Sequence, residues 1–107
     1  MKIEKHQIGE RWTVLSLSGQ IDTVAAPVLE QACRAELREK VELALDLSGV
    51  TYLSSAGLRA ILGTAKELGP LHARLVLVSP QPVVRDTLEI SGFGRFLPVV
   101  ASLQSLE

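Results

Sequence analysis

The sequence has no excess of charge of either sign, since 11 lysines and arginines stand against 12 aspartates and glutamates. It therefore offers no basic field to a nucleic acid or an anionic membrane, and aromatic residues, at 4%, are too few for a base-stacking platform. A single cysteine cannot form an internal disulfide, which suits a reducing compartment. No apolar run could span a bilayer, and residues 1–6 lack the apolar core of an export signal. We expect a cytoplasmic protein that neither binds nucleic acid nor inserts into a membrane.

The residues that most enzyme sites need are also scarce. The only histidines, His6 and His72, are far in sequence from any nucleophile signature, and no Gly-Lys-Ser or Gly-Lys-Thr phosphate loop occurs. The segment Gly92-Phe93-Gly94 lacks the third glycine of a dinucleotide-binding loop. Cys33 and the two histidines are too scattered to form a ligand-spaced metal site. We therefore expect a protein that is not an enzyme and that needs no cofactor or metal.

The hydrophobic pattern that is present predicts one α/β domain over residues 1–107. Period-two patterns and β-formers predict strands over residues 3–8, 12–17, 41–47, 74–78 and 96–100. Period-3.6 patterns predict helices over residues 28–37, 56–68 and 83–91, with a closing helical turn over 101–106. The order β-β-α-β-α-β-α-β-α favours a mixed, largely parallel sheet of about four to five strands with helical crossovers.

Local signals make narrower predictions about these elements. Residues 19–23 should end the second strand, and Asp22 or Thr23 should cap the next helix. The strand over 41–47 alternates leucine and valine with polar or small residues, which predicts one buried face. Pro98 predicts an edge position for the last strand. The apolar face of the first helix should consist of Val28, Leu29, Ala32, Cys33 and Leu37.

Residues 46–58 organise the rest of the chain. An alternating strand is predicted to enter a short polar loop that delivers Ser54 and Ser55 to the start of a helix. A hydroxyl at this position could carry a phosphate, because free backbone N–H groups and the helix dipole favour negative charge there. From the residues alone, a phosphorylation switch at Ser55 and a simple helix cap are both open. Asp22 and Asp46 could gather at the same sheet edge, or serve only as a helix cap and a solvated strand end.

The stretch from Leu45 to Leu58 resembles the signature of STAS domains of the bacterial anti-sigma factor antagonist family. The segment Ser18-Gly19-Gln20-Ile21-Asp22 is similar to an upstream element of that family. The resemblance implies a single, non-enzymatic STAS domain. The unmodified antagonist would bind an anti-sigma factor that is also an ATP-dependent serine kinase, and thereby release the sigma factor. Phosphorylation by this kinase would switch binding off, and a metal-dependent serine phosphatase would restore it.

The resemblance also implies roles for individual residues. Ser55 matches the phosphoacceptor, and Asp22 matches an acidic residue near it. The family often has aspartate where this chain has Ser54, which makes Ser54 a minor rival acceptor. The implied partner-binding residues are Asp22, Thr23, Ser54, Ser55, Ala56, Gly57 and Leu58. STAS domains also serve in stressosome-type signalling complexes and as subunits of lipid-transport ATPases, and these are the alternative functions.

Overall fold

The computed structural model describes residues 1–92 and 97–106. Its strands are β1 (Lys2–Ile8), β2 (Trp12–Ile21), β3 (Glu42–Leu53), β4 (Arg74–Val78) and β5 (Val99–Val100). Its helices are α1 (Ala25–Arg34), α2 (Ser55–Leu68) and α3 (Pro82–Ile90), with the short 3-10 turns η1 (Gly69–Leu71) and η3 (Leu103–Leu106). This order confirms the predicted alternation of strands and helices. Phe93, Gly94 and Phe96, on which two of the sequence interpretations fell, lie outside the described residues.

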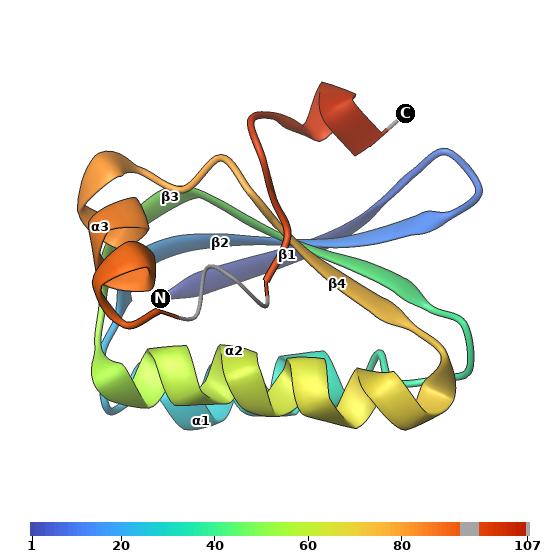
Figure 1. Cartoon of the computed structure of the whole chain (residues 1–107), viewed down its shortest axis with the longest axis horizontal. Coiled ribbons are helices and arrows are strands. Elements are labelled where there is room, and N and C mark those ends of the chain that lie inside the picture. The colour runs from blue at the N-terminus through green and yellow to red at the C-terminus, as the bar shows by residue number, and fades with distance from the viewer. Residues whose placement is uncertain (93–96, 107) are drawn as a thin grey trace.

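The five strands form one sheet in the order β1-β2-β3-β4-β5. Strand β1 runs antiparallel to β2, whereas β2–β3, β3–β4 and β4–β5 are parallel pairs. Helices α1 and α2 lie side by side against one face of the sheet, and η3 lies on the opposite side (Figure 1). This arrangement confirms the mixed, largely parallel sheet with helical crossovers, and it places the short strand β5 at an edge as Pro98 predicted.

The sheet separates two apolar clusters, and β3 contributes to both. The larger cluster includes Leu43, Leu45 and Leu47 of β3 together with buried residues of all three α-helices. Ala44, which points to the opposite face, belongs to the smaller cluster. The prediction of a single buried face for this strand was therefore wrong. The second face is buried because the C-terminal segment covers it. The smaller cluster and the residues packed against it are Ile8, Trp12, Val14, Ala44, Val76, Val78, Val100, Leu103 and Leu106.

The strands β2 and β3 are longer than the sequence predicted. They pair from Trp12 opposite Glu42 to Ile21 opposite Leu53. Strand β2 does end within residues 19–23, at Ile21, whereas the polar loop predicted before Ser54 belongs to β3. The register shifts twice along this pair, the second time between Gly19 and Gln20. Gly19 has a φ of 93°, a conformation that glycine adopts readily. Gly19 and Gln20 therefore lie at an irregularity within the paired strands, and β2 ends directly after them, at Ile21.

The helices differ from their predicted bounds mainly at α1. It begins at Ala25 and ends at Arg34, so Pro27 falls in its first turn, whereas Leu37 lies beyond its end. Leu29 and Cys33 are fully buried on its inner face. Val28, which was expected on that face, is 52% exposed. Helix α2 stops at Leu68, directly before Gly69-Pro70, as the sequence predicted.

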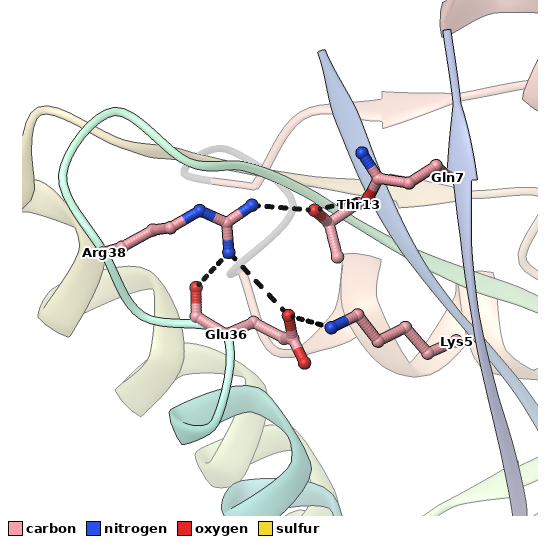
Figure 2. A network of polar contacts seen from close by, with 5 residues as sticks. All are labelled: Lys5, Gln7, Thr13, Glu36 and Arg38. Carbon is pink, nitrogen blue, oxygen red and sulfur yellow. Dashed lines mark hydrogen bonds and ion pairs between the residues drawn. The ribbon is translucent and has the colours of Figure 1, made fainter. Parts of the chain in front are cut away.

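A network of polar contacts ties the connection between α1 and β3 to the first two strands (Figure 2). The Glu36 side chain is 8% exposed, and its carboxylate lies 2.9 Å from the Lys5 ammonium and 3.8 Å from the Arg38 guanidinium. Arg38 also donates to the Thr13 hydroxyl at 3.2 Å, and Thr13 donates to the Gln7 side-chain oxygen at 2.9 Å. The nearly buried carboxylate is thus compensated by two cations on different elements.

We expect Glu36→Ala to lower the free energy of unfolding by about 1–2 kcal/mol, because both cations lose their carboxylate and the connection loses its link to β1. Urea unfolding followed by circular dichroism measures this change. Glu4→Ala is the matched control, since Glu4 pairs with Lys2 but its side chain is 64% exposed. This control should change stability by less than about 0.5 kcal/mol. Equal effects of the two substitutions would contradict the structural role of Glu36.

Candidate functional site

The carboxyl ends of β2 and β3 bring together two segments that are about thirty residues apart in sequence. Ile21 pairs with Leu53, so Asp22 and Ser54 follow the two strands at the same edge of the sheet. The Ser54 backbone N–H donates to the Ile21 carbonyl oxygen at 2.9 Å, which continues the strand pairing by one residue. The first turns of α1 and α2 therefore start next to each other (Figure 1).

Ser54 is the N-cap of α2. Its backbone is extended, with φ −77° and ψ 166°, and its hydroxyl oxygen accepts the Gly57 N–H at 3.0 Å. The same hydroxyl donates to the Ile21 carbonyl oxygen at 2.8 Å, and the residue is only 8% exposed. Both hydrogen-bonding functions of this hydroxyl are engaged in the interior, so a modifying enzyme could reach it only if the helix start opened.

Ser55 is the first residue of α2 and is exposed. Within the described part of the chain, its side chain has no hydrogen-bond partner. The two neighbouring serines thus have different environments: one hydroxyl holds the helix start together, and the other projects into solvent. An added phosphate would lie in the first turn of the helix, where negative charge is favourable by about 0.3–1 kcal/mol.

Gly57 allows α2 to approach β2 and β3 closely. An added Cβ would lie 2.6 Å from Ile21 Cγ2, 2.9 Å from the Ile21 carbonyl oxygen and 2.9 Å from Leu53 Cδ1. Leu58, the next residue, is 6% exposed and belongs to the larger apolar cluster. The glycine and leucine of the motif therefore set the position of the helix, and with it the position of Ser55.

Asp22 begins the other half of the site. Its carboxylate accepts the Ala25 N–H at 2.8 Å, and its carbonyl oxygen accepts the Ala26 N–H at 3.0 Å. The carboxylate thus supports the start of α1, although the N-cap itself is Val24 and not Asp22 or Thr23 as predicted. Thr23 is exposed beside it.

Asp46 does not join Asp22 at this edge. It lies within β3 opposite Ser16, several residues before the strand ends, and it is 8% exposed. Its carboxylate accepts the Ser16 hydroxyl at 3.1 Å and the Ser48 N–H at 3.0 Å. The expectation that the two aspartates gather was wrong because β3 continues beyond Asp46, and the solvated strand end was wrong for the same reason.

The seven predicted partner-binding residues lie together around the starts of α1 and α2, but they do not share one environment. Asp22 and Ala56 are half-buried, and Thr23 and Ser55 are exposed. Ser54, Gly57 and Leu58 are buried. The first four can contact a partner directly, whereas the other three hold the backbone that presents them.

Sequence reasoning did not find two hollows beside this edge. One, of about 320 Å³, lies between α1 and α2 and is bordered by Thr23, Ala56 and Arg59. The other, of about 410 Å³, is bordered by Asp22 and by Val24, which is 82% exposed. Both depend on how α1 packs against its neighbours, and the sequence pattern carries no signal of that packing.

The two histidines and the single cysteine lie in other parts of the described structure than Ser55. His6, on β1, is hydrogen-bonded to Ser16 at 2.9 Å, and His72 follows η1 with a φ of 54°. Burial raises the pKa of the Cys33 thiol to about 11, so it stays protonated near neutral pH.

Across residues 1–92 and 97–106, no group of three or more potential ligands could hold a metal ion. No helix in these ranges is long and apolar enough to cross a membrane.

Comparison with known proteins agrees with this geometry. The STAS domain family matches residues 2–106. BtrV of Bordetella bronchiseptica, which carries the provisional name of an anti-sigma factor antagonist, is 37% identical over 93 residues, covering 86% of this chain and 80% of BtrV. The crystal structure of an anti-sigma factor antagonist from Mycobacterium paratuberculosis is 31% identical, with a TM-score of 0.83 and coverage of 97% and 90%.

A third similarity concerns the fold alone. The phosphorylated form of SpoIIAA, a Bacillus cell fate determinant, has a TM-score of 0.71 at 17% identity, covering 98% of this chain and 96% of SpoIIAA. The five-stranded mixed sheet with three helices is therefore shared with solved structures across a wide range of sequence identity.

Proposed function

Since this chain belongs to the STAS domain family, we propose that it is an anti-sigma factor antagonist whose partner binding is switched by phosphorylation of Ser55. The observation that carries the proposal is the contrast between the two serines. Ser54 is buried with its hydroxyl engaged twice, whereas Ser55 is exposed at the first position of α2. The names of relatives with 37% and 31% identity support the antagonist function.

The proposed cycle has two states. In the unmodified state, the surface around Ser55 binds an anti-sigma factor that is also a serine kinase, and the sigma factor is released. The kinase then transfers the γ-phosphoryl group of ATP to the Ser55 hydroxyl oxygen, while ADP leaves and a base of the kinase takes the hydroxyl proton. A metal-dependent serine phosphatase hydrolyses the phosphate ester and restores the first state. ATP and the metal ion belong to these partners, and we place the cycle in the cytoplasm.

The partner surface consists of the exposed part of the site. Asp22, Thr23, Ser55 and Ala56 present a carboxylate, two hydroxyl groups and two methyl groups around the starts of α1 and α2. The small side chain of Ala56 leaves room for a partner's backbone to approach Ser55. Phosphorylation replaces a neutral hydroxyl in this surface with about −1.5 to −2 charges, which a closely fitting partner would have to desolvate or repel.

A catalytic role for Ser55 has no support from its surroundings. A nucleophilic serine needs a general base within hydrogen-bond reach. Both histidines belong to other regions of the fold, and His6 is already bonded to Ser16. We therefore propose that Ser55 acts only as a substrate of the partner kinase.

Incubation with the cognate kinase and ATP, followed by mass-spectrometric mapping, tests the proposal. We expect one phosphate, at Ser55, and no phosphorylation of Ser55→Ala. Ser54→Ala is the matched control: it should lose about 1 kcal/mol of stability with its cap but remain a substrate. Continued phosphorylation of Ser55→Ala at Ser54 or elsewhere would overturn the assignment.

A further inference from the structure

A groove lies between α1 and α2, and it is bordered by Ala56, the residue that follows Ser55. On the α2 side it is bordered by Ala56, Ala60 and Gly63, whose small side chains leave a volume of about 320 Å³. Three charged residues also border it, Glu30 of α1 and Arg59 and Glu67 of α2, together with Thr23, Ala26 and Pro27. We therefore expect the charged residues at its border to determine which groups can bind in this groove.

The two carboxylates that border this groove already pair with Arg34. The Arg34 guanidinium lies 2.8 Å from the Glu30 carboxylate and 3.5 Å from the Glu67 carboxylate. Arg59, at the end near Ser55, is exposed and has no ion pair or hydrogen bond with any described residue. One cation thus remains without an acceptor beside the serine that the kinase is proposed to modify.

We propose that Arg59 binds the phosphate of phosphorylated Ser55 and holds it along the rim of this groove. The proposal rests on the proposed function, because it assigns the residue that receives the modification. Arg59 follows Ser55 by four residues on the same helix, a spacing that brings side chains to neighbouring positions with Cβ atoms about 5–6 Å apart. An acidic group four residues before a basic one is also the favourable order on a helix.

The chemistry of the two groups suits this contact. The planar guanidinium can donate two parallel N–H bonds, and a phosphate offers three acceptor oxygens. The Glu30 and Glu67 carboxylates that border the groove oppose entry of the phosphate into it. Phosphorylation then changes two side chains of the partner surface at once: a dianion appears at Ser55, and the guanidinium of Arg59 turns towards it.

A chain with phosphoserine installed at position 55 during translation tests the contact without any kinase. The probe is the phosphorus NMR shift, which follows the second ionisation of the phosphate with an ordinary pKa near 6. We expect this pKa to be lower by about 0.4 in the parent chain than in Arg59→Gln, because Arg59 favours the dianion. Arg59→Lys should restore most of the difference, since it keeps the charge.

Lys66→Gln is the matched control, because it removes an exposed cation of the same helix that lies about 16 Å from Ser55 along the helix axis. It should leave the phosphate pKa within about 0.1 of the parent value. An unchanged pKa in Arg59→Gln, or an equal change in Lys66→Gln, overturns the proposal. Because the phosphate is installed without the kinase, failure of the kinase to modify Ser55 would refute the proposed function and leave this result standing.

Discussion

Replacing Gly57 with alanine is expected to lower the free energy of unfolding by about 2–3 kcal/mol. The added methyl group would lie 2.6 Å from Ile21 Cγ2 and 2.9 Å from the Ile21 carbonyl oxygen. That oxygen is fixed, because it accepts hydrogen bonds from both the backbone N–H and the hydroxyl of Ser54. The start of α2 must therefore move away from β2, and the cap formed by Ser54 must stretch. Urea unfolding of the parent and variant chains measures the loss.

Gly63→Ala provides a control in the same helix. Apart from its chain neighbours and the backbone of its own helix turn, no atom lies within 4 Å of the position that its Cβ would occupy, and the residue is inside α2. Alanine has the higher helix propensity by about 1 kcal/mol, so this variant should be more stable than the parent chain. Opposite signs for the two substitutions distinguish close approach at Gly57 from a general effect of glycine in the helix. A neutral Gly57→Ala would contradict the packing described for the site.

The displacement at Gly57 should also reach the proposed switch. Ser55 precedes Gly57 by two residues and belongs to the turn that must move. Phosphorylation of the Gly57→Ala chain by the partner kinase should therefore be slower than that of Gly63→Ala. The same comparison thus connects the steric role of the glycine with the presentation of the serine.

The order of elements could be predicted because each periodic segment carries its own signal. The stripe of Leu58, Ile61 and Leu68 specifies α2, and Gly69-Pro70 ends it at the expected residue. Strand β4 is apolar at every position except Arg74, a pattern typical of a strand that is covered on both faces. These features depend on neighbours in the sequence, so one chain is enough to reveal them.

Other features depend on contacts between distant segments. The sequence predicted that the second strand ends before Gly19 and Gln20. They lie within β2 because β3 pairs with them across a register shift. Ala44 was assigned to an outer face, and only the docking of the C-terminal segment shows that this face is buried. Val28 has the period of a core residue but is exposed, because α1 covers the sheet through Leu29 and Cys33. Tertiary packing overrode the local pattern in each case.

The candidate site also combines features that the sequence reveals with features that only the structure shows. The adjacent serines at a helix start were visible in the sequence, and the structure gives Ser54 the cap and leaves Ser55 exposed. Asp22 follows β2 at the same edge, as an acidic residue near Ser55 requires. Asp46 does not lie at this edge, because β3 continues to Leu53. The polar residues after Asp46 gave no signal that the strand is this long. Arg59 became a candidate only when the pairing of Arg34 with Glu30 and Glu67 was known.

Ser55→Asp is expected to weaken binding of the partner kinase by about 100-fold, or about 2.7 kcal/mol, while the domain stays folded. The carboxylate introduces charge at the centre of the proposed interface, where desolvation and repulsion oppose association. The same charge is favourable for α2 itself, because it lies in the first helical turn. The free energy of unfolding of the Ser55→Asp domain should therefore stay within about 0.5 kcal/mol of the parent value or rise slightly. Calorimetric titration and urea unfolding measure the two quantities separately.

Ser55→Asn separates charge from shape. Asparagine has nearly the size of aspartate and is neutral, so a charge-controlled switch should lose less than about tenfold in affinity with this variant. Added salt should narrow the gap between the two variants, because exposed charges are screened at ionic strengths of about 0.1 M and above. Equal losses for aspartate and asparagine would mean that the interface rejects any larger side chain at this position. In that case phosphorylation would act by bulk, and the charge of the phosphate would matter only for its contact with Arg59.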